Sequence, residues 1–80
     1  MSDQVEVFLD ILTDEPNDRI SKHILKLLDR LGIKERHFTS GTNHIRAFTT
    51  WKETEISTNV KEVENIPHVK TVKARILMPI

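Results

Sequence analysis

One helix constrains the fold of this chain more than any other feature. Apolar residues recur at helical spacing, at Ile20, Ile24, Leu27, Leu28 and Leu31. This spacing places them in one stripe along the helix, and such a stripe must be buried against another element. Gly32 follows directly, at the position where a helix C-cap favours a left-handed residue. The chain therefore has to supply a sheet or a second helix that covers this face.

Strand patterns lie on both sides of the helix. Residues 5–12, 33–40, 44–51 and 69–77 are rich in β-branched and aromatic residues or alternate between apolar and polar ones. Alternation brings the apolar side chains of a strand to one face. The residues expected on that face are Val5, Val7, Leu9 and Ile11, then Phe38, then Ile45, Ala47 and Thr49, and finally Val72, Ala74 and Ile76.

The remaining segments connect these elements. Residues 40–43, Ser-Gly-Thr-Asn, are typical of a hairpin turn between the second and third strands. A short second helix is predicted by three apolar residues at helical spacing, Ile56, Val60 and Val63. Thr54 is its expected N-cap, and Pro67 lies beyond its end.

The order of the elements is β-α-β-β-α-β, which predicts a single ferredoxin-like α+β domain over residues 1–80. The first β-α-β unit requires a right-handed crossover. We expect a four-stranded antiparallel sheet in the order 4-1-3-2, with both helices on one face. The core should contain Leu9, Ile24, Leu28, Val60 and Val72.

Composition excludes several functional classes. The chain has no cysteine, which rules out disulfides, thiol chemistry and cysteine metal ligands. Its two glycines are too few for a dinucleotide fingerprint or a phosphate loop. Twelve basic residues balance twelve acidic ones, which argues against a mainly electrostatic nucleic-acid binder. No nucleophile–base arrangement is apparent, and we expect neither catalysis nor a cofactor.

The sequence also bears on location. The N-terminus does not have the pattern of a signal peptide, and no apolar run reaches the length of a membrane span. Together with the lack of cysteine, these features predict a cytoplasmic protein.

Three short motifs resemble those of ACT domains, the small ligand-sensing modules of amino-acid metabolism. Residues 14–20, Asp-Glu-Pro-Asn-Asp-Arg-Ile, are similar to the family's Asp-x-Pro-Gly turn, with Asp14 and Pro16 matching. Residues 27–33 resemble the end of the family's first helix, and residues 65–76 resemble its Ile-Pro-x-Val-x-x-Val approach to the last strand. The resemblance implies a regulatory homodimer in which a neighbouring subunit closes a pocket for a small effector at the first loop.

The loop departs from the ACT pattern at the predicted site. Asn17 stands in the glycine position, where asparagine tolerates a left-handed conformation and the turn can survive. Asp14, Glu15 and Asp18 would repel a ligand carboxylate, whereas the start of a helix favours negative charge. We interpret these acids as helix caps. The alternative is that they form, with Pro16 and Asn17, a site for a cation or an amine.

Four histidines, at positions 23, 37, 44 and 68, raise the question of a metal site. His37 and His44 flank the hairpin turn and could approach each other on one face. Zinc sites need three or four ligands at recognisable spacing, which the sequence lacks. We therefore expect solvated surface histidines and no metal.

The face of the sheet away from the helices is a second candidate site. Alternation places Phe8 and Phe48 outward on adjacent strands, as in RNA-recognition sheets. Positive charge around them would come from His37, His44, Arg46, Lys73 and Arg75. Opposing acids on this face are Glu6, Asp10 and Glu35, and the glycine-aromatic RNA signature is missing.

These observations favour a small non-catalytic regulatory module, dimeric, that binds a small effector at the first loop or docks on a larger protein. Single-stranded nucleic-acid binding on the open face is the alternative, and a purely structural interaction module is a third. We expect Phe8, Phe48 and Leu77 to pack against another subunit or a partner protein in preference to nucleic acid.

Overall fold

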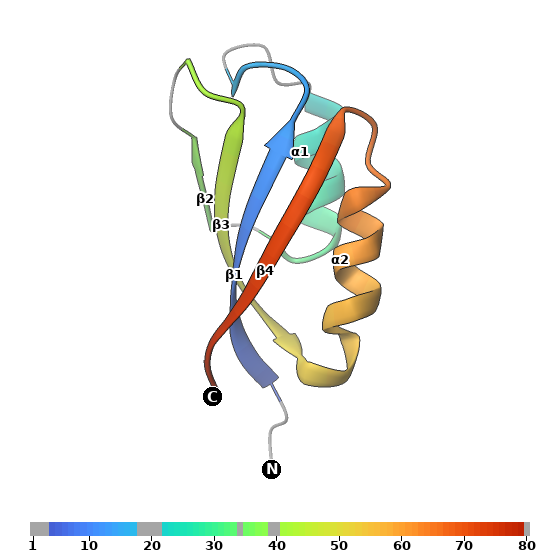
Figure 1. Ribbon diagram of the computed structural model, residues 1–80. Helices are drawn as coiled ribbons and strands as arrows, with labels where there is room; N and C mark the ends of the chain where they lie inside the picture. The colour runs from blue at the N-terminus through green and yellow to red at the C-terminus, as the bar shows by residue number, and fades with distance from the viewer. Residues whose placement is uncertain (1–3, 18–21, 34, 39–40, 80) are drawn as a thin grey trace.

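Two helices cover one face of a four-stranded antiparallel sheet and leave the other face open (Figure 1). This computed structural model describes residues 4–17, 22–33, 35–38 and 41–79. The strand order is β2-β3-β1-β4, which is the predicted order 4-1-3-2 read from the other edge. The prediction of a ferredoxin-like α+β fold is confirmed.

The elements follow the predicted order along the chain. They are β1 (Gln4–Thr13), α1 (Lys22–Arg30), β2 (Glu35–Phe38), β3 (His44–Lys52), the 3-10 turn η2 (Glu53–Glu55), α2 (Ile56–Glu64) and β4 (Val69–Pro79). β1 is central and pairs with both β3 and β4, whereas β2 and β4 form the sheet edges. In the described part of the chain, neither α1 nor α2 has the length and apolar character to cross a membrane.

The core lies between the sheet and the helices. Alternate residues of β1, from Val5 to Thr13, are buried on the helix-covered face. Of the predicted core, Leu9, Ile24 and Leu28 are buried, whereas Val60 and Val72 are partly buried against it. The predicted helix residue Ile20 lies outside the described residues.

The end of α1 has the geometry that its sequence predicts. Gly32 has a φ of +78°. Its N–H donates to the Asp29 carbonyl at 3.0 Å, and the Ile33 N–H donates to the Leu28 carbonyl at 2.9 Å. This is the Schellman arrangement, in which a left-handed residue turns the chain away and satisfies carbonyls that the helix leaves unpaired.

The inward side chains of β3 complete this helix end. The Thr49 hydroxyl donates to the Gly32 carbonyl at 3.0 Å, and Trp51 Nε1 donates to the Leu31 carbonyl at 2.9 Å. Both side chains are buried, so their polar groups need these partners. The contacts fix α1 relative to the sheet.

Three burial predictions are wrong at the sheet edges. Phe38 pairs with buried Ile45, yet it is 42% exposed. Ile76 pairs with buried Val7 but is 49% exposed, and Ala74 is also exposed. Each side chain belongs to the helix-covered face by register. These residues lie on the edge strands β2 and β4, which have a neighbouring strand on one side only. The two helices do not extend far enough over the edges to bury them.

The prediction that Thr54 caps α2 is also wrong. The chain passes from β3 through η2 directly into the helix, and Glu55 takes the N-cap position without a side-chain hydrogen bond. Thr54 lies inside η2, so it is not at the extended position from which a capping hydroxyl acts.

Candidate functional site

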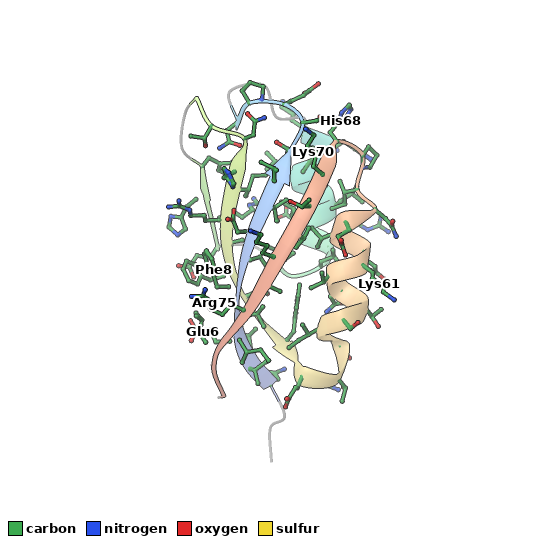
Figure 2. The ribbon with its side chains drawn as sticks, viewed as in Figure 1. Glu6, Phe8, Lys61, His68, Lys70 and Arg75 are labelled. Carbon is green, nitrogen blue, oxygen red and sulfur yellow. The ribbon has the colours of Figure 1, made fainter. Side chains whose placement is uncertain are left out.

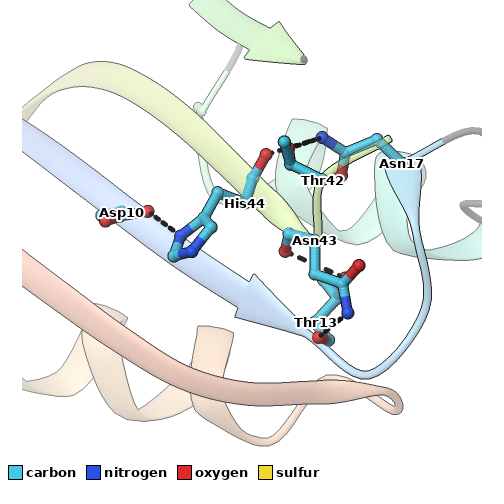
Figure 3. A network of polar contacts seen from close by, with 6 residues as sticks. All are labelled: Asp10, Thr13, Asn17, Thr42, Asn43 and His44. Carbon is cyan, nitrogen blue, oxygen red and sulfur yellow. Dashed lines mark hydrogen bonds and ion pairs between the residues drawn. The ribbon is translucent and has the colours of Figure 1, made fainter. Parts of the chain in front are cut away.

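Asn17 ties the β1–α1 loop to the β2–β3 hairpin (Figure 3). It is 8% exposed. Its Nδ2 donates to the His44 carbonyl at 2.7 Å and to Thr42 Oγ1 at 3.2 Å. Its backbone N–H donates to the Thr42 carbonyl at 2.8 Å. Asn17 is therefore a buried brace between two loops. Asn17 does not have a positive φ. Among the described residues other than glycine, His68 is the one that does.

The neighbouring backbone groups of the loop are also used within the chain. The Thr13 N–H donates to the Asn43 carbonyl and the Asp14 N–H donates to the His68 carbonyl, both at 2.9 Å. The Thr13 hydroxyl donates to the Glu15 carbonyl at 2.6 Å. The backbone N–H groups of residues 13, 14 and 17 thus already have acceptors within the chain and are not free to bind a ligand carboxylate.

The acids around α1 have separate roles. Asp14 Oδ1 lies 3.1 Å from His68 Nδ1, so this carboxylate contacts the segment before β4. Asp29 pairs with Arg36 Nη1 at 2.8 Å, and this nitrogen also donates to the Leu25 carbonyl at 3.1 Å. The second pair joins β2 to α1. Asp18 lies outside the described residues.

Three residues at this end of the molecule can offer ligand atoms to one point. The ligand atoms of Asp14, Glu15 and His68 lie within 4.8 Å of one another. Pro16 is exposed beside them. His37 and His44 lie on one face as diagonal neighbours, because His37 pairs with Arg46, two residues along β3 from His44. Each contacts a different acid: His44 Nδ1 lies 3.0 Å from Asp10 Oδ1, and His37 Nε2 lies 3.8 Å from Glu35 Oε1.

The open face presents its side chains in rows across the strands. One row runs from β2 to β4 through Glu35, Phe48, Phe8 and Arg75. The next row runs through His37, Arg46, Asp10 and Lys73. Figure 2 shows Glu6, Phe8 and Arg75 pointing away from the helices, on the opposite side from Lys61 of α2. Paired residues of antiparallel strands share a face. The sheet therefore brings together the residues predicted for this face, with His44 in the row beyond.

Two phenyl rings occupy the centre of the open face. The ring centroids of Phe8 and Phe48 are 5.2 Å apart, and the ring planes are tilted by 50°. His37 lies 6.0 Å from Phe48 in an edge-on arrangement. Both phenyl side chains are half-buried. Part of each ring is thus open to a flat or apolar ligand.

The cations beside the rings are not neutralised by the described residues. Arg46, Lys73 and Arg75 form no ion pair or hydrogen bond through their side chains with any residue that the structure describes. Asp10 faces Arg46 and Lys73 in register, but its carboxylate contacts His44 instead. These charges are available to an anionic partner.

Two hollows flank the aromatic pair, and they differ in charge. A hollow of about 330 Å³ beside Phe48 is lined by Glu6, Gly32, Glu35, Thr49 and Thr50. A hollow of about 220 Å³ beside Phe8 is lined by Asp10, Lys73, Ala74 and Arg75. The first presents the carboxylates of Glu6 and Glu35, and the second presents the two cations Lys73 and Arg75 with one carboxylate, Asp10. A further hollow of about 270 Å³ lies between the helices, beside Leu27 and Ile66.

Sequence reasoning treated Glu6 and Glu35 only as charges that oppose an anionic ligand. The β1–β3–β2 register brings their side chains to one hollow, where both line its wall. The partnership of Asp14 with His68 was also missed, because it joins residues 54 positions apart. No local signal in the sequence indicates either arrangement.

Comparison with known proteins adds no functional assignment. No protein-family model matches the chain, and no protein of curated function is significantly similar to it. The resemblance to ACT domains therefore stays a prediction, and the ferredoxin-like α+β class is what the structure defines.

Proposed function

We propose that this protein is a non-catalytic module that binds single-stranded nucleic acid on its open sheet face. One observation carries the proposal. The half-buried pair Phe8 and Phe48 is bordered by Arg46, Lys73 and Arg75, which have no ionic partner among the described residues. The face therefore combines flat apolar surface with unpaired positive charge.

Nucleic-acid bases match the first of these properties. A base stacked on an aromatic side chain contributes about 1–3 kcal/mol, with little dependence on which base it is. The 50° tilt between the two rings means that two consecutive bases on them cannot stay parallel. A single strand can splay its bases in this way, whereas a duplex keeps them paired and stacked. The tilt favours a single-stranded partner.

Phosphates match the second property. Three cations without an ionic partner among the residues that the structure describes suit a short stretch of nucleic-acid backbone. The neutral charge of the whole chain limits the electrostatic contribution. With three phosphates neutralised, the logarithm of the binding constant should fall with the logarithm of salt concentration with a slope of about −2. Binding should thus be salt-sensitive but depend substantially on stacking.

The β1–α1 loop is less suited to binding an effector than the open face is to binding single-stranded nucleic acid. A ligand carboxylate at the loop would compete with the acceptors that the N–H groups of Asp14 and Asn17 already contact. Asn17 Nδ2 is also engaged, with His44 and Thr42. On the open face, Arg46, Lys73 and Arg75 have no ionic partner among the described residues that a ligand would have to displace.

The test is fluorescence anisotropy with a labelled single-stranded oligonucleotide of mixed sequence. Phe48→Ala should weaken binding at least several-fold, because it removes one stacking surface. Phe38→Ala is the matched control, since Phe38 is 42% exposed but lies on an edge strand with the helix-covered face. Equal loss in both variants, or no binding by the wild-type protein at low salt, would contradict the proposal.

The same variants distinguish nucleic acid from a second copy of the chain. If the open face is instead a dimer interface, sedimentation should show a wild-type dimer that Phe48→Ala dissociates and that oligonucleotide does not affect. That result would assign the rings to self-association and reject nucleic acid as their partner.

A second candidate is the predicted ACT-like regulatory role, with a cation or an amine at the β1–α1 loop. The observation that favours it is the convergence of ligand atoms from Asp14, Glu15 and His68 within 4.8 Å. Calorimetric titration with Zn²⁺ and with amino acids tests it. Binding that is lost in both Asp14→Asn and His68→Ala supports this candidate, and binding that survives both variants rejects it.

A further inference from the structure

The two hollows beside the aromatic pair have opposite charge, and this asymmetry indicates how a nucleotide would lie. We infer, on the basis of the proposed function, that the open face prefers guanine. The guanine edge would lie in the hollow lined by Glu6 and Glu35, and a phosphate would lie at Lys73 and Arg75. The face would then select a base as well as a single strand.

The acidic hollow sits where the edge of a stacked base would reach. Glu35 is the register partner of Phe48 across β2 and β3, and Glu6 lies two residues before Phe8 on the same face of β1. The Glu35 side chain is 69% exposed, and its Oε1 lies 3.8 Å from His37 Nε2. A carboxylate only accepts hydrogen bonds when ionised. A base whose edge carries adjacent donors is therefore favoured here.

Guanine has the edge that fits this requirement best. Its N1–H and its N2 amino group are neighbouring donors, and together they can make two parallel hydrogen bonds to one carboxylate, as a guanidinium does. Adenine and cytosine place one amino donor beside an acceptor nitrogen. Uracil and thymine place a single N–H between two carbonyl oxygens, which the carboxylate would repel. The expected order is guanine first, adenine and cytosine next, and uracil or thymine last.

The cationic hollow would hold the phosphate of the nucleotide. Arg75 is the register partner of Phe8, and Lys73 is the register partner of Asp10, whose carboxylate contacts His44. From Glu35 to Arg75 the row crosses three strand spacings, or about 14 Å at the usual spacing of antiparallel strands. Glu35 lines the same hollow as Phe48, and Arg75 lines the same hollow as Phe8, so a base on the rings has a carboxylate at one end of the row and a cation at the other. Base edge and phosphate can thus be held at once.

The test compares seven-nucleotide RNAs that are all uridine except for one central base, which is guanine, adenine, cytosine or uracil. With the wild-type protein, the guanine probe should bind about tenfold more tightly than the all-uridine probe, the scale of charge-assisted hydrogen bonds. Glu35→Gln should remove most of this preference without weakening the all-uridine probe. Glu64→Gln on α2 is the control and should change neither value.

Further arms separate the parts of the inference. Arg75→Gln should weaken all four probes alike, because phosphate contacts carry no base information. Competition with guanosine monophosphate distinguishes a free nucleotide from a nucleic-acid strand. If guanosine monophosphate displaces the probe at a concentration equal to that of the probe, the free nucleotide is the ligand of this site.

The outcomes are distinguishable from failure of the proposed function. Equal binding of the four probes, or a preference that survives Glu35→Gln, would overturn the guanine inference and leave single-strand binding intact. Absence of binding to every probe would overturn both.

Discussion

The two faces of the sheet are built from alternate residues of the same strands, and they differ in how completely their groups are used. On the helix-covered face of β1, Val7, Leu9 and Ile11 are fully buried. Two side chains of β3 on this face, Thr49 and Trp51, donate to carbonyls at the end of α1. On the open face, Phe8 is half-buried and Arg75 lacks an ionic partner among the described residues.

Because successive residues of a strand point to opposite faces, the residues that stabilise the fold and those available for recognition alternate along the same strands. A group that is already buried and hydrogen-bonded can contribute to folding but has little left to offer a ligand. A group that is exposed and unpaired contributes little to folding and remains available. Substitutions on the two faces should therefore affect different measurements.

The largest expected effect is in the buried core. Leu28→Ala should lower the free energy of unfolding by about 2–5 kcal/mol, because it leaves a cavity beneath α1. Urea denaturation measures this change. Leu77→Ala is the control, since Leu77 is 43% exposed. A cost for Leu28→Ala of less than about 1 kcal/mol, the scale of surface substitutions, would break the distinction between the faces.

The next effect is at the loop brace. Asn17→Ala should destabilise the protein by about 1–3 kcal/mol, because it removes the donor to the buried contact with the His44 carbonyl. Thermal unfolding measures it, with the exposed Asn65→Ala as the control. A neutral result would mean that the loop does not need this brace, and it would strengthen the case for an effector site there.

The aromatic pair should contribute less to folding than to binding. In a double-mutant cycle, Phe8→Leu and Phe48→Leu should show a coupling of about 0.5–1.5 kcal/mol in unfolding free energy, as expected for an aromatic pair. A much larger coupling would show that the pair mainly stabilises the fold, and it would argue against a role in recognition.

The smallest effect concerns the pair between Asp14 and His68. Both side chains are substantially exposed, at 43% and 51%. Asp14→Asn should therefore change stability by no more than about 1 kcal/mol. Chemical denaturation at low and high salt checks this, because a surface pair loses strength as salt is added. A larger, salt-independent loss would show that the loop is part of the structural core.

Much of the fold could be predicted from the sequence because each signal is local. The stripe ending at Leu31 and the glycine after it define α1, and the alternation of Val7, Leu9 and Ile11 defines the buried face of β1. The errors arise where burial depends on neighbours. Phe38 and Ile76 have the right periodicity but lie on edge strands, and their exposure depends on how far the helices extend.

The candidate site was predictable in part for the same reason. Phe8 and Phe48 could be placed outward and adjacent from alternation and strand order alone. The brace by Asn17 could not, because it joins a loop to a hairpin 27 residues away. The opposite charges of the two hollows depend on strand register, which the sequence does not fix to the residue.

The measurement that tests the central claim most directly is a titration of ¹⁵N-labelled protein with a single-stranded RNA, followed by amide chemical shifts. Binding on the open face predicts that the largest shifts fall on central β1 and β3, around Phe8, Arg46 and Phe48, and on Arg75 of β4. The loop around Asn17 should change little. Shifts concentrated at residues 14–17 and 68, or no shifts at any RNA concentration, would contradict the account.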